Sequence, residues 1–396
     1  MKRALLLTGI RVVDFSTAYA GPYAAKLLGD LGADVIHVET GDRLDIMREY
    51  PPYGAPDGPD RSGSFASIHR NKRGLALNLK RPGAGEVMTR LIRAADVLVE
   101  NFTPRVLPSL GFPWATIQQI NPRLVYCRMP GFGASGPNRE YRSYGPTLEA
   151  QSGIAYMTGY DDEPPLRMGC SYPDMVGGVT GAFAILAALR QRTRTGRGAV
   201  LELPQQQAAA ALTGIALAQW TINKQLTGRM GNRHPWFVPH DVYRCAGEDR
   251  WVAIVVRDDA QWARLAPRLD LPPLTRGQRR DRLGEIDRAL ARFTGARDAE
   301  AVARELTALG IEAYPVRTAL DLSHDPHVAA RGFIETIDHG AIGPRPYAGP
   351  PWQITGAPTA PHRPAPQLGQ HTDDILTELG YSADEAARLR QDGALR

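Results

Sequence analysis

The sequence predicts an α/β protein: a Rossmann-like large domain built on a parallel sheet, plus a smaller α+β domain. Short apolar segments alternate with helical segments over the first 130 residues, which is typical of a parallel sheet with right-handed crossovers. The chain has 396 residues, more than the roughly 250–300 that one hydrophobic core usually serves. After residue 228 the long apolar segments give way to charged amphipathic ones. The sequence therefore predicts two domains of different character.

The first strand of the predicted sheet is Ile10–Phe15, which is apolar and rich in β-branched residues. Gly21-Pro22 opens a helix, because proline fits a first turn in which no N–H needs a partner, and Gly32 ends it. Further strands are expected at Asp34–Glu39, Leu75–Leu79, Asp96–Glu100 and Leu124–Arg128, with a helix at Gly85–Ala94. Ligands of such sheets bind beyond the carboxyl ends of the strands, so the loops there are candidate binding segments.

Two long helices are expected in the middle of the chain. Met175–Leu189 is apolar on all sides, which indicates a buried helix, and Leu203–Leu226 is a second long helix that could connect two domains. In the smaller domain we expect a strand at Trp251–Val256 and charged helices over Ala260–Leu309. Two short helices, His371–Leu379 and Ala383–Gln391, are expected near the end of the chain.

Composition argues against several classes of protein. The net charge is only +5 and no basic stripe carries interleaved aromatic residues, so we expect no nucleic-acid partner. No uninterrupted apolar run reaches the roughly 18 residues of a membrane span. Arg11 and Asp14 interrupt the apolar N-terminal segment, which favours a buried strand at Ala4–Ile10 over a signal peptide. Three widely spaced cysteines favour a reducing compartment, so we expect a cytoplasmic protein without a membrane partner.

Asp174 is the candidate catalytic residue. It follows Pro173, and Gly177 and Gly178 come one turn later. The structural interpretation is a helix N-cap, which is the commoner use of aspartate at such a place. The functional interpretation is a nucleophile: helix N–H groups would keep the carboxylate ionised, and the glycines would let a ligand approach it. The two interpretations are compatible.

Other motifs are weaker. Gly131–Gly136 matches a dinucleotide-binding pattern, but the polar run that follows is no apolar helix, so a nicotinamide site is disfavoured. His324 and His327 have no evident third ligand, so we expect no metal site. Cys170 has no neighbouring base in the sequence, and a core cysteine is the simpler interpretation.

Beyond these patterns, the sequence resembles the family III CoA-transferases, the superfamily of formyl-CoA transferase, carnitine CoA-transferase and α-methylacyl-CoA racemase. The matching segments run in the family's order over essentially the whole chain. They are Leu7–Ser16, Ala20–Pro22, Leu28–Glu39, Asn71–Arg73, Glu100–Phe102, Gly131–Pro137, Ser143–Pro146, Gln151–Gly153, Pro165–Arg167, Arg194–Gly198, Gly231–Pro235 and Leu368–Thr372.

The resemblance implies a domain arrangement in which both termini build the large domain. Residues 1–203 would form its first, CoA-binding part, residues 204–227 a connecting helix, residues 228–325 the small domain, and residues 326–396 a return segment that completes the large domain. It also implies a homodimer whose two chains are interlocked like linked rings.

The resemblance further implies transfer of coenzyme A from an acyl-CoA donor to a carboxylic acid through Asp174, which becomes an acyl anhydride and then an aspartyl-CoA thioester. Coenzyme A and acyl-CoA are substrates here, and no permanently bound cofactor or metal is implied. By position-for-position match with formyl-CoA transferase, the CoA contacts would be Tyr19, Ala20, Leu77, Lys80, Asn101, Phe102, Arg142 and Tyr144.

Several positions depart from the family pattern. His37 replaces a common lysine, Thr40 and Ser109 stand where formyl-CoA transferase has CoA-contacting arginines, and Gly145 replaces a glutamate. Arg142 replaces a lysine, which keeps the charge and changes its geometry. These differences argue against oxalate as the natural acceptor.

Three other functions compete with CoA transfer. An α-methylacyl-CoA racemase would need a histidine paired with Asp174, and the loop Arg142–Pro146 has none. A non-catalytic CoA-binding protein would bind coenzyme A without turnover, and the retained Asp174 argues against it. A nicotinamide oxidoreductase is disfavoured by the loop at Gly131–Gly136.

Overall fold

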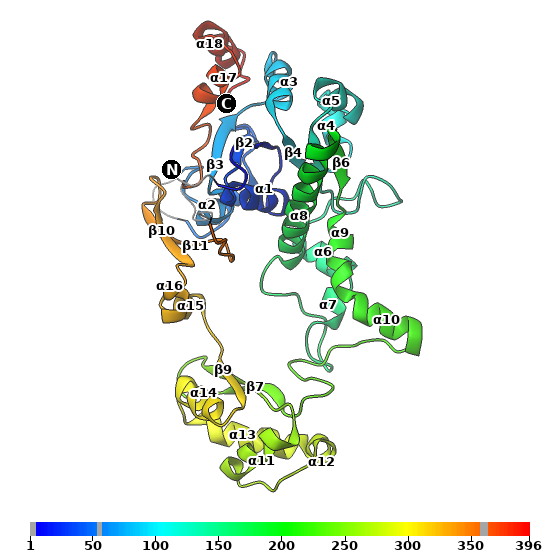
Figure 1. The fold of residues 1–396 in the computed structure, drawn as a ribbon, viewed down its shortest axis with the longest axis vertical. Helices are drawn as coiled ribbons and strands as arrows, with labels where there is room; N and C mark the ends of the chain where they lie inside the picture. Colours follow the sequence, from blue (N-terminus) through cyan, green and yellow to red (C-terminus); the bar gives the residue numbers. More distant parts are fainter. Residues whose placement is uncertain (1–4, 54–57, 357–362) are drawn as a thin grey trace. The chain divides into compact units, whose positions relative to one another are not determined.

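A computed structural model describes residues 5–53, 58–356 and 363–396. The chain divides into two compact units (Figure 1). Unit 1 contains Met1–Ala155, Arg167–Leu226 and His327–Arg396, and unit 2 contains Tyr156–Leu166 and Thr227–Pro326. This division differs from the expected one in a single internal segment, since Tyr156–Leu166 clusters with unit 2 rather than with the rest of residues 1–203.

Unit 1 is built on a six-stranded sheet in the order β3-β2-β1-β4-β5-β6, and every strand pair is parallel. This is the Rossmann strand order, in which the order reverses between β1 and β4 and ligands bind beyond the carboxyl ends of the strands. The strands are β1 Arg11–Asp14, β2 Asp34–Glu39, β3 Lys72–Ala76, β4 Val97–Glu100, β5 Val125–Arg128 and β6 Ala199–Glu202.

Two strands differ from the prediction. β3 covers Lys72–Ala76, three residues before the expected Leu75–Leu79, and β6 at Ala199–Glu202 was not expected. Of the apolar N-terminal run, residues 6–9 form a turn, and the first strand begins only at Arg11. The strand expected at Ala4–Ile10 is therefore wrong.

Helices cover both faces of this sheet because successive strand residues point to opposite faces. Val12 and its neighbours pack with α1 (Ala20–Asp30) and α8 (Tyr172–Thr195). Val13 and its neighbours pack with α3 (Ala84–Ala94), α17 (Thr372–Glu378) and α18 (Ala383–Gln391). The C-terminal helices thus complete the core of unit 1 (Figure 1).

Helix α8 is long and apolar enough to cross a membrane by length and composition alone. Its residues Ala182, Ile185 and Leu189 belong to the hydrophobic core beneath the sheet. The helix predicted at Met175–Leu189 is thus confirmed and extends further at both ends. Its burial on all sides is not, since Val179 and Phe183 are 53% and 72% exposed.

Unit 2 has a three-stranded antiparallel sheet, β7-β8-β9, covered by helices. Trp262, Ile286 and Leu290 are buried in its own core. The elements that form this core are β7 His240–Arg244, β8 Trp251–Val255, β9 Glu312–Pro315, α11 Asp259–Leu265, η3 Ala266–Leu269, α13 Leu283–Gly295 and α14 Ala299–Ala308.

The remaining elements are short helices and one hairpin. The hairpin joins β10 Ile334–Asp338 to β11 Pro344–Ala348. The helices are η1 Ile46–Glu49, α2 Gly63–His69, α4 Val106–Ser109, α5 Trp114–Ile120, α6 Gly145–Gln151, α7 Ile154–Met157, α9 Gln205–Ala210, η2 Ala211–Thr213, α10 Gly214–Asn223, α12 Arg276–Asp281, α15 Ala319–Ser323 and α16 Pro326–Ala330.

Candidate active site

Asp174 lies in the first turn of α8 and is partly buried. Burial raises the pKa of its carboxyl group to about 6; the hydrogen bond from Ser171 lowers it and the nearby Glu149 charge raises it. Among the described residues no lysine, arginine or histidine forms an ion pair with this carboxylate. The helix N–H groups therefore do not hold the pKa low, as the sequence reasoning expected, because the loss of solvation is the larger effect.

The first residue of α6 lies directly against this carboxylate. A Cβ atom built on Gly145 would lie 2.6 Å from Asp174 Oδ2 and 3.1 Å from Ser171 Oγ. Any larger residue at this position would displace the carboxylate of Asp174. Glycine, which stands here in place of the family's glutamate, therefore leaves space for that carboxylate.

Tyr19 is close enough to Asp174 for the two groups to interact electrostatically. It is the N-cap residue of α1 and follows Ala18, whose φ of 63° is unusual for a residue other than glycine. The Ala18 N–H donates to both carboxylate oxygens of Asp45, at 3.2 and 3.1 Å, which holds this loop. Burial, Tyr23 and the charge of Asp174 raise the pKa of Tyr19 to about 12. Tyr19 and Asp174 are therefore neighbours.

The two glycines after Asp174 serve helix packing. A Cβ on Gly178 would lie 2.7 Å from Tyr23 Cδ1 and 3.0 Å from the Ala20 carbonyl oxygen, and one on Gly177 would lie 3.7 Å from Ala20 Cβ. They let α1 approach α8, whereas the sequence reasoning expected them to admit a ligand.

Four of the predicted CoA contacts gather at the carboxyl ends of β1 and β4. The Asn101 side chain donates to the Thr17 carbonyl at 2.7 Å and accepts from the Thr17 N–H at 2.9 Å. Phe102 packs edge-on against Phe15, with ring centroids 5.4 Å apart. Tyr19 and Ala20 follow in the same loop.

The other four predicted contacts lie elsewhere. Leu77 is buried and belongs to the core, while Lys80 is exposed in the loop after β3. Arg142 and Tyr144 are exposed just before α6, beside the residue that touches Asp174.

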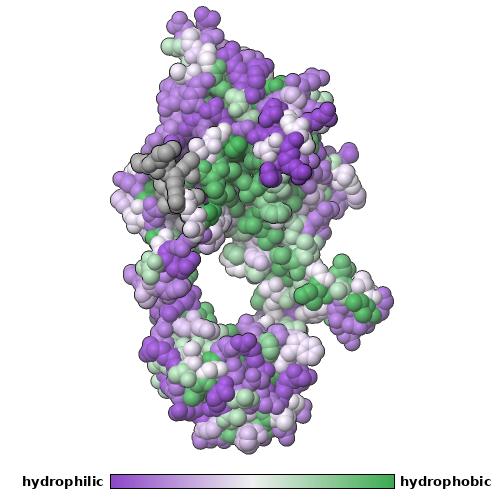
Figure 2. Space-filling view, viewed as in Figure 1, coloured by the Kyte–Doolittle hydropathy of each residue, from purple (hydrophilic) through white to green (hydrophobic). Residues whose placement is uncertain are grey.

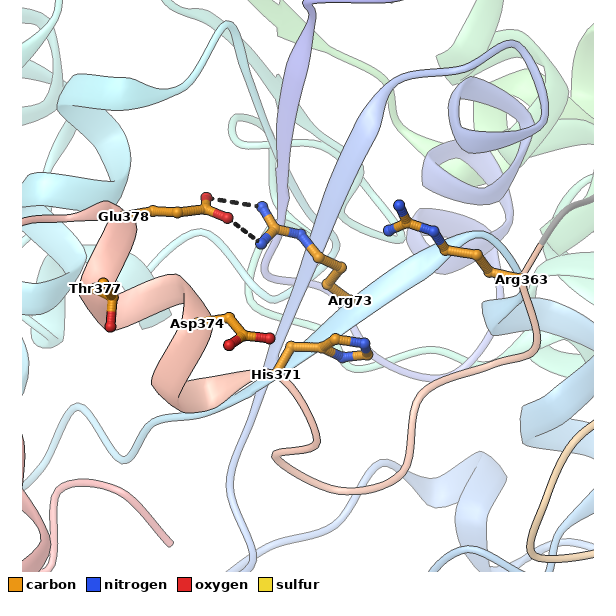
Figure 3. A pocket seen from close by; sticks show the side chains of 6 residues that line it. All are labelled: Arg73, Arg363, His371, Asp374, Thr377 and Glu378. Carbon is orange, nitrogen blue, oxygen red and sulfur yellow. Dashed lines mark hydrogen bonds and ion pairs between the residues drawn. The ribbon is translucent and has the colours of Figure 1, made fainter.

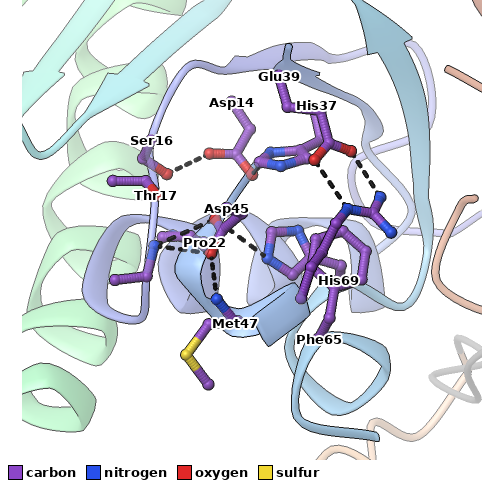
Figure 4. A network of polar contacts seen from close by, with 12 residues as sticks. Asp14, Ser16, Thr17, Pro22, His37, Glu39, Asp45, Met47, Phe65 and His69 are labelled. Carbon is purple, nitrogen blue, oxygen red and sulfur yellow. Dashed lines mark hydrogen bonds and ion pairs between the residues drawn. The ribbon is translucent and has the colours of Figure 1, made fainter. Parts of the chain in front are cut away.

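A buried network of polar side chains includes Asp14, His37, Asp45 and His69 (Figure 4). Asp45 connects it to the loop before Tyr19, since it accepts from the Ala18 N–H. The Lys72 ammonium donates to Asp14 at 2.8 Å and to the Pro22 carbonyl at 2.9 Å, and lies 3.2 Å from His69 Nδ1. Asp14, His37 and His69 could by geometry hold a metal ion. Lys72 already supplies the positive charge at this place, so the residues do not fit an added cation.

Two cavities of about 560 Å³ each are found in unit 1. One is polar and lies beside α17, where Arg73 forms an ion pair with Glu378 (Figure 3). Arg73 is also paired with Asp34. The wall of the other cavity includes Tyr19, which is a neighbour of Asp174, and Met175, which follows Asp174 in the chain. This cavity therefore adjoins the candidate nucleophile.

The sequence reasoning missed three residues around this site. Ser171 lowers and Glu149 raises the pKa of Asp174, on top of the larger effect of burial, and Lys26 lines the adjoining cavity. None carries a motif, and only their positions in the fold bring them together.

The parallel sheet in Rossmann order, with Asp174 in the first turn of α8, places the protein in the class of α/β proteins with a Rossmann-like domain. The chain belongs to CoA-transferase family III, whose family model matches residues 7–372. The predicted family, α/β fold and activity of transferring coenzyme A between an acyl-CoA and a carboxylic acid are thus confirmed.

Named relatives have similar lengths. The chain is 30% identical to succinyl-CoA–D-citramalate CoA-transferase of Chloroflexus aurantiacus, covering 97% of this chain and 96% of that one. It is 33% identical to acetyl-CoA:oxalate CoA-transferase of Acetobacter aceti, covering 96% of both chains. A CAIB/BAIF family protein from Brucella suis has a similar structure, with a TM-score of 0.87 at 28% identity over 96% of this chain and all of that one.

Proposed function

We propose that Asp174 is the nucleophile of the transfer reaction. Its carboxylate oxygen attacks the thioester carbonyl of the donor, the C–S bond breaks, and coenzyme A leaves as a thiolate. The thiolate then attacks the carbonyl of Asp174 in the resulting anhydride and releases the donor acid. The products of this half-reaction are an aspartyl-CoA thioester and the free donor carboxylate.

The second half reverses these steps with the acceptor. The acceptor carboxylate attacks the aspartyl thioester and releases the thiolate, which attacks the acceptor carbonyl and frees Asp174. Each step exchanges one acyl bond for another, and dividing the exchange into smaller steps is the benefit of covalent catalysis.

The observation that carries this proposal is the unpaired, partly buried carboxylate. A pKa of about 6 leaves Asp174 mostly ionised at neutral pH, and no cation among the described side chains competes for its oxygens. Loss of solvation makes a carboxylate a better nucleophile when the surroundings exclude water.

For coenzyme A we propose the residues carried over from the family: Tyr19, Ala20, Leu77, Lys80, Asn101, Phe102, Arg142 and Tyr144. Lys80 and Arg142 are exposed cations suited to the phosphates. Leu77 is 2% exposed, so its side chain supports the site from within the core and its backbone is the part that can meet the ligand.

We also propose a cytoplasmic homodimer. Cys127, Cys170 and Cys245 are free thiols, as expected in a reducing compartment. Unit 1 carries exposed apolar side chains on α8 and α10 (Figure 2), and Ile215 and Ile222 of α10 are 88% and 77% exposed. An apolar face of this kind is typical of an interface, and the family's interlocked dimer would cover it.

The test of the nucleophile is covalent trapping. Wild-type protein is incubated with acetyl-CoA or succinyl-CoA, treated with hydroxylamine, and measured by intact mass and peptide mapping. We expect a hydroxamate at Asp174, and we expect Asp174→Asn to abolish both the hydroxamate and CoA transfer while CoA still binds. Asp384→Asn, an exposed residue of α18, serves as control. Normal transfer by Asp174→Asn would refute the assignment.

A further inference from the structure

The cavity beside Asp174 contains a lysine, Lys26, that forms no ion pair with any of the described residues. Lys26 is only 9% exposed. Its Nζ lies 5.0 Å from the centroid of the Tyr23 ring, so the side chain turns back by one helical turn toward the start of α1. Within the described part of the chain, Nζ has no hydrogen-bond or ion-pair partner. A largely buried ammonium without a partner is costly, so an anionic ligand in the cavity would stabilise it.

The neighbouring charges leave Lys26 available. Asp30 is the acidic residue nearest along α1, and Arg70 holds both its oxygens at 2.9 and 2.6 Å. Arg345 is exposed at the cavity, and its one hydrogen bond to a described residue is the donation to the Pro344 carbonyl at 2.8 Å. No carboxylate side chain is found among the described residues that line the cavity. The net charge of its wall is therefore positive.

The rest of the wall suits a short carbon skeleton. Ile68, Met175 and Ile342 supply apolar surface, and Tyr53 and Tyr347 supply aromatic rings. The buried hydroxyl of Tyr347 has no hydrogen-bond partner among the described residues. A volume of about 560 Å³ lies within the usual range of small-molecule sites, roughly 300–1,000 Å³.

The placement of Lys26 relative to Asp174 follows from the helix pair. Tyr23 packs against Gly178, and Tyr19 is a neighbour of Asp174. Lys26 is seven residues beyond Tyr19, about 10 Å along the helix axis, and its side chain points back over part of that length.

We propose that this cavity binds the acceptor acid and that Lys26 binds the second carboxylate of a dicarboxylic acid whose first carboxylate reacts at Asp174. The inference rests on the proposed function of Asp174 and adds the substrate class: short-chain dicarboxylates. Arg345 adds positive charge at the opening of the cavity.

The charge of Lys26 makes binding of the diacid depend on pH. Burial is the largest cause that lowers the pKa of Lys26 to about 7, and the charges of Arg70 and Lys72 lower it further while Asp30 raises it. The other charged or titratable side chains that face the cavity are Arg345, Tyr19, Tyr23, Tyr53 and Tyr347. Lys26 is cationic below pH 7, so diacid binding weakens as the pH rises through about 7.

The test compares acids that differ in one carboxylate. Rates of CoA transfer from acetyl-CoA, whose acyl group has no second carboxylate, are measured with glutarate against pentanoate and with succinate against butanoate. We expect Lys26→Met to lower the ratio of kcat/KM for the diacid over the monoacid about tenfold or more, and Lys26→Arg to restore it. Arg388→Met, which removes an exposed cation of α18, leaves the ratio as in wild type. An unchanged ratio in Lys26→Met overturns the proposal, as does a rise in the KM of acyl-CoA instead.

Two measurements keep the outcomes separate. Binding of glutarate and pentanoate to Asp174→Asn is measured by calorimetry, which needs no turnover. If glutarate binding depends on Lys26 but the wild type transfers no CoA, the proposed transfer reaction is wrong and the Lys26 subsite stands. If the wild type transfers CoA but its preference for diacids over monoacids does not depend on Lys26, only the subsite proposal is wrong. The wild-type pH profile needs no variant: the KM of glutarate rises above pH about 7 and that of pentanoate stays flat, and equal profiles overturn the proposal.

Discussion

Gly145 sets the room around the Asp174 carboxylate. The first residue of α6 can lie against Asp174 only because it has no side chain, since a Cβ there would be 2.6 Å from Oδ2. Ser171 and Glu149 then adjust the protonation of the same carboxylate in opposite directions. The reactivity of this residue therefore depends on neighbours that carry no recognisable catalytic motif.

Gly145→Ala tests this contact. The added methyl group pushes the carboxylate from its position, and a displacement of about 1 Å can cost about 100-fold in rate. We expect kcat to fall at least tenfold with the thermal unfolding midpoint retained. Gly85→Ala, a substitution early in α3 where a Cβ meets nothing within 4 Å, should leave kcat at the wild-type level. A normal kcat in Gly145→Ala would show that the carboxylate tolerates displacement.

The pKa of Asp174 predicts how the rate depends on pH. The nucleophile must be ionised, and its pKa is raised from 3.8 to about 6. Transfer should therefore be full above pH about 7 and fall as the pH drops through about 6, about tenfold per unit further down. Initial rates of kcat/KM for the acyl-CoA donor, measured between pH 5 and pH 8, check this. A flat profile down to pH 5 would contradict the elevated pKa.

At the scale of the elements, the active site depends on the contact between α1 and α8. Gly178 and Gly181 bring the helices together, and Gly181 would place a Cβ 3.6 Å from Ala24 Cβ. The helices run in the same direction, since Gly177 lies by Ala20 and Gly181 by Ala24. Tyr19 and Asp174 are thereby held at the same end of the pair.

Gly178→Ala tests the helix contact. The new methyl group would be 2.7 Å from Tyr23 Cδ1 and 3.0 Å from a backbone oxygen, and overpacking of this kind costs about 1–3 kcal/mol. We expect that loss in the free energy of unfolding, measured in urea. Gly277→Ala in α12, where a Cβ meets nothing within 4 Å, should be neutral or stabilising by up to about 1 kcal/mol. Equal stability of Gly178→Ala and wild type would show that α1 can move.

The alternation of short apolar segments with helical segments predicted most strands of unit 1. The exceptions have physical causes. The apolar residues Leu75, Leu77 and Leu79 suggested a strand, but the ladder begins at Lys72, whose charge is buried against Asp14. Hydropathy cannot identify a buried, paired lysine as a strand residue. β6 at Ala199–Glu202 is a short, incompletely buried edge strand, so its pattern is weak.

The site was predictable only where a family motif exists. Asp174 was predicted from its place before a glycine-containing apolar helix and from the family resemblance, and its role stays a prediction. Lys26 was not found, because a lysine in an amphipathic helix is usually a solvated residue. It lines the cavity together with Tyr23, Arg70 and the hairpin residue Arg345, which are brought together by the tertiary fold.

At the scale of the whole molecule, unit 1 contains the proposed nucleophile, its neighbours and the adjoining cavity. Unit 2 has a core of its own around Trp262. The exposed apolar residues of α8 and α10 belong to unit 1, so the expected subunit interface and the reactive carboxylate share helix α8.

The proposed dimer can be weakened at α10. Ile215→Asp combined with Ile222→Asp places charges on the apolar face, and burying them without partners is unfavourable. We expect the molar mass from sedimentation equilibrium to shift from two chains toward one. Gln219→Glu, a charge change at a polar residue of the same helix, is the control. A wild-type protein that sediments as a single chain would overturn the dimer.

Helix α1 has a consequence for how acids are sorted by size. The proposed nucleophile on α8 and the lysine on α1 belong to two helices that pack closely at Gly178, so the distance between the reacting carbon and the distant charge cannot lengthen to suit each acid. If specificity evolved toward a longer or shorter acid, the positive charge of Lys26 would have to move along α1 by a whole helical turn, about 5 Å. Gradual widening of the cavity would not be enough.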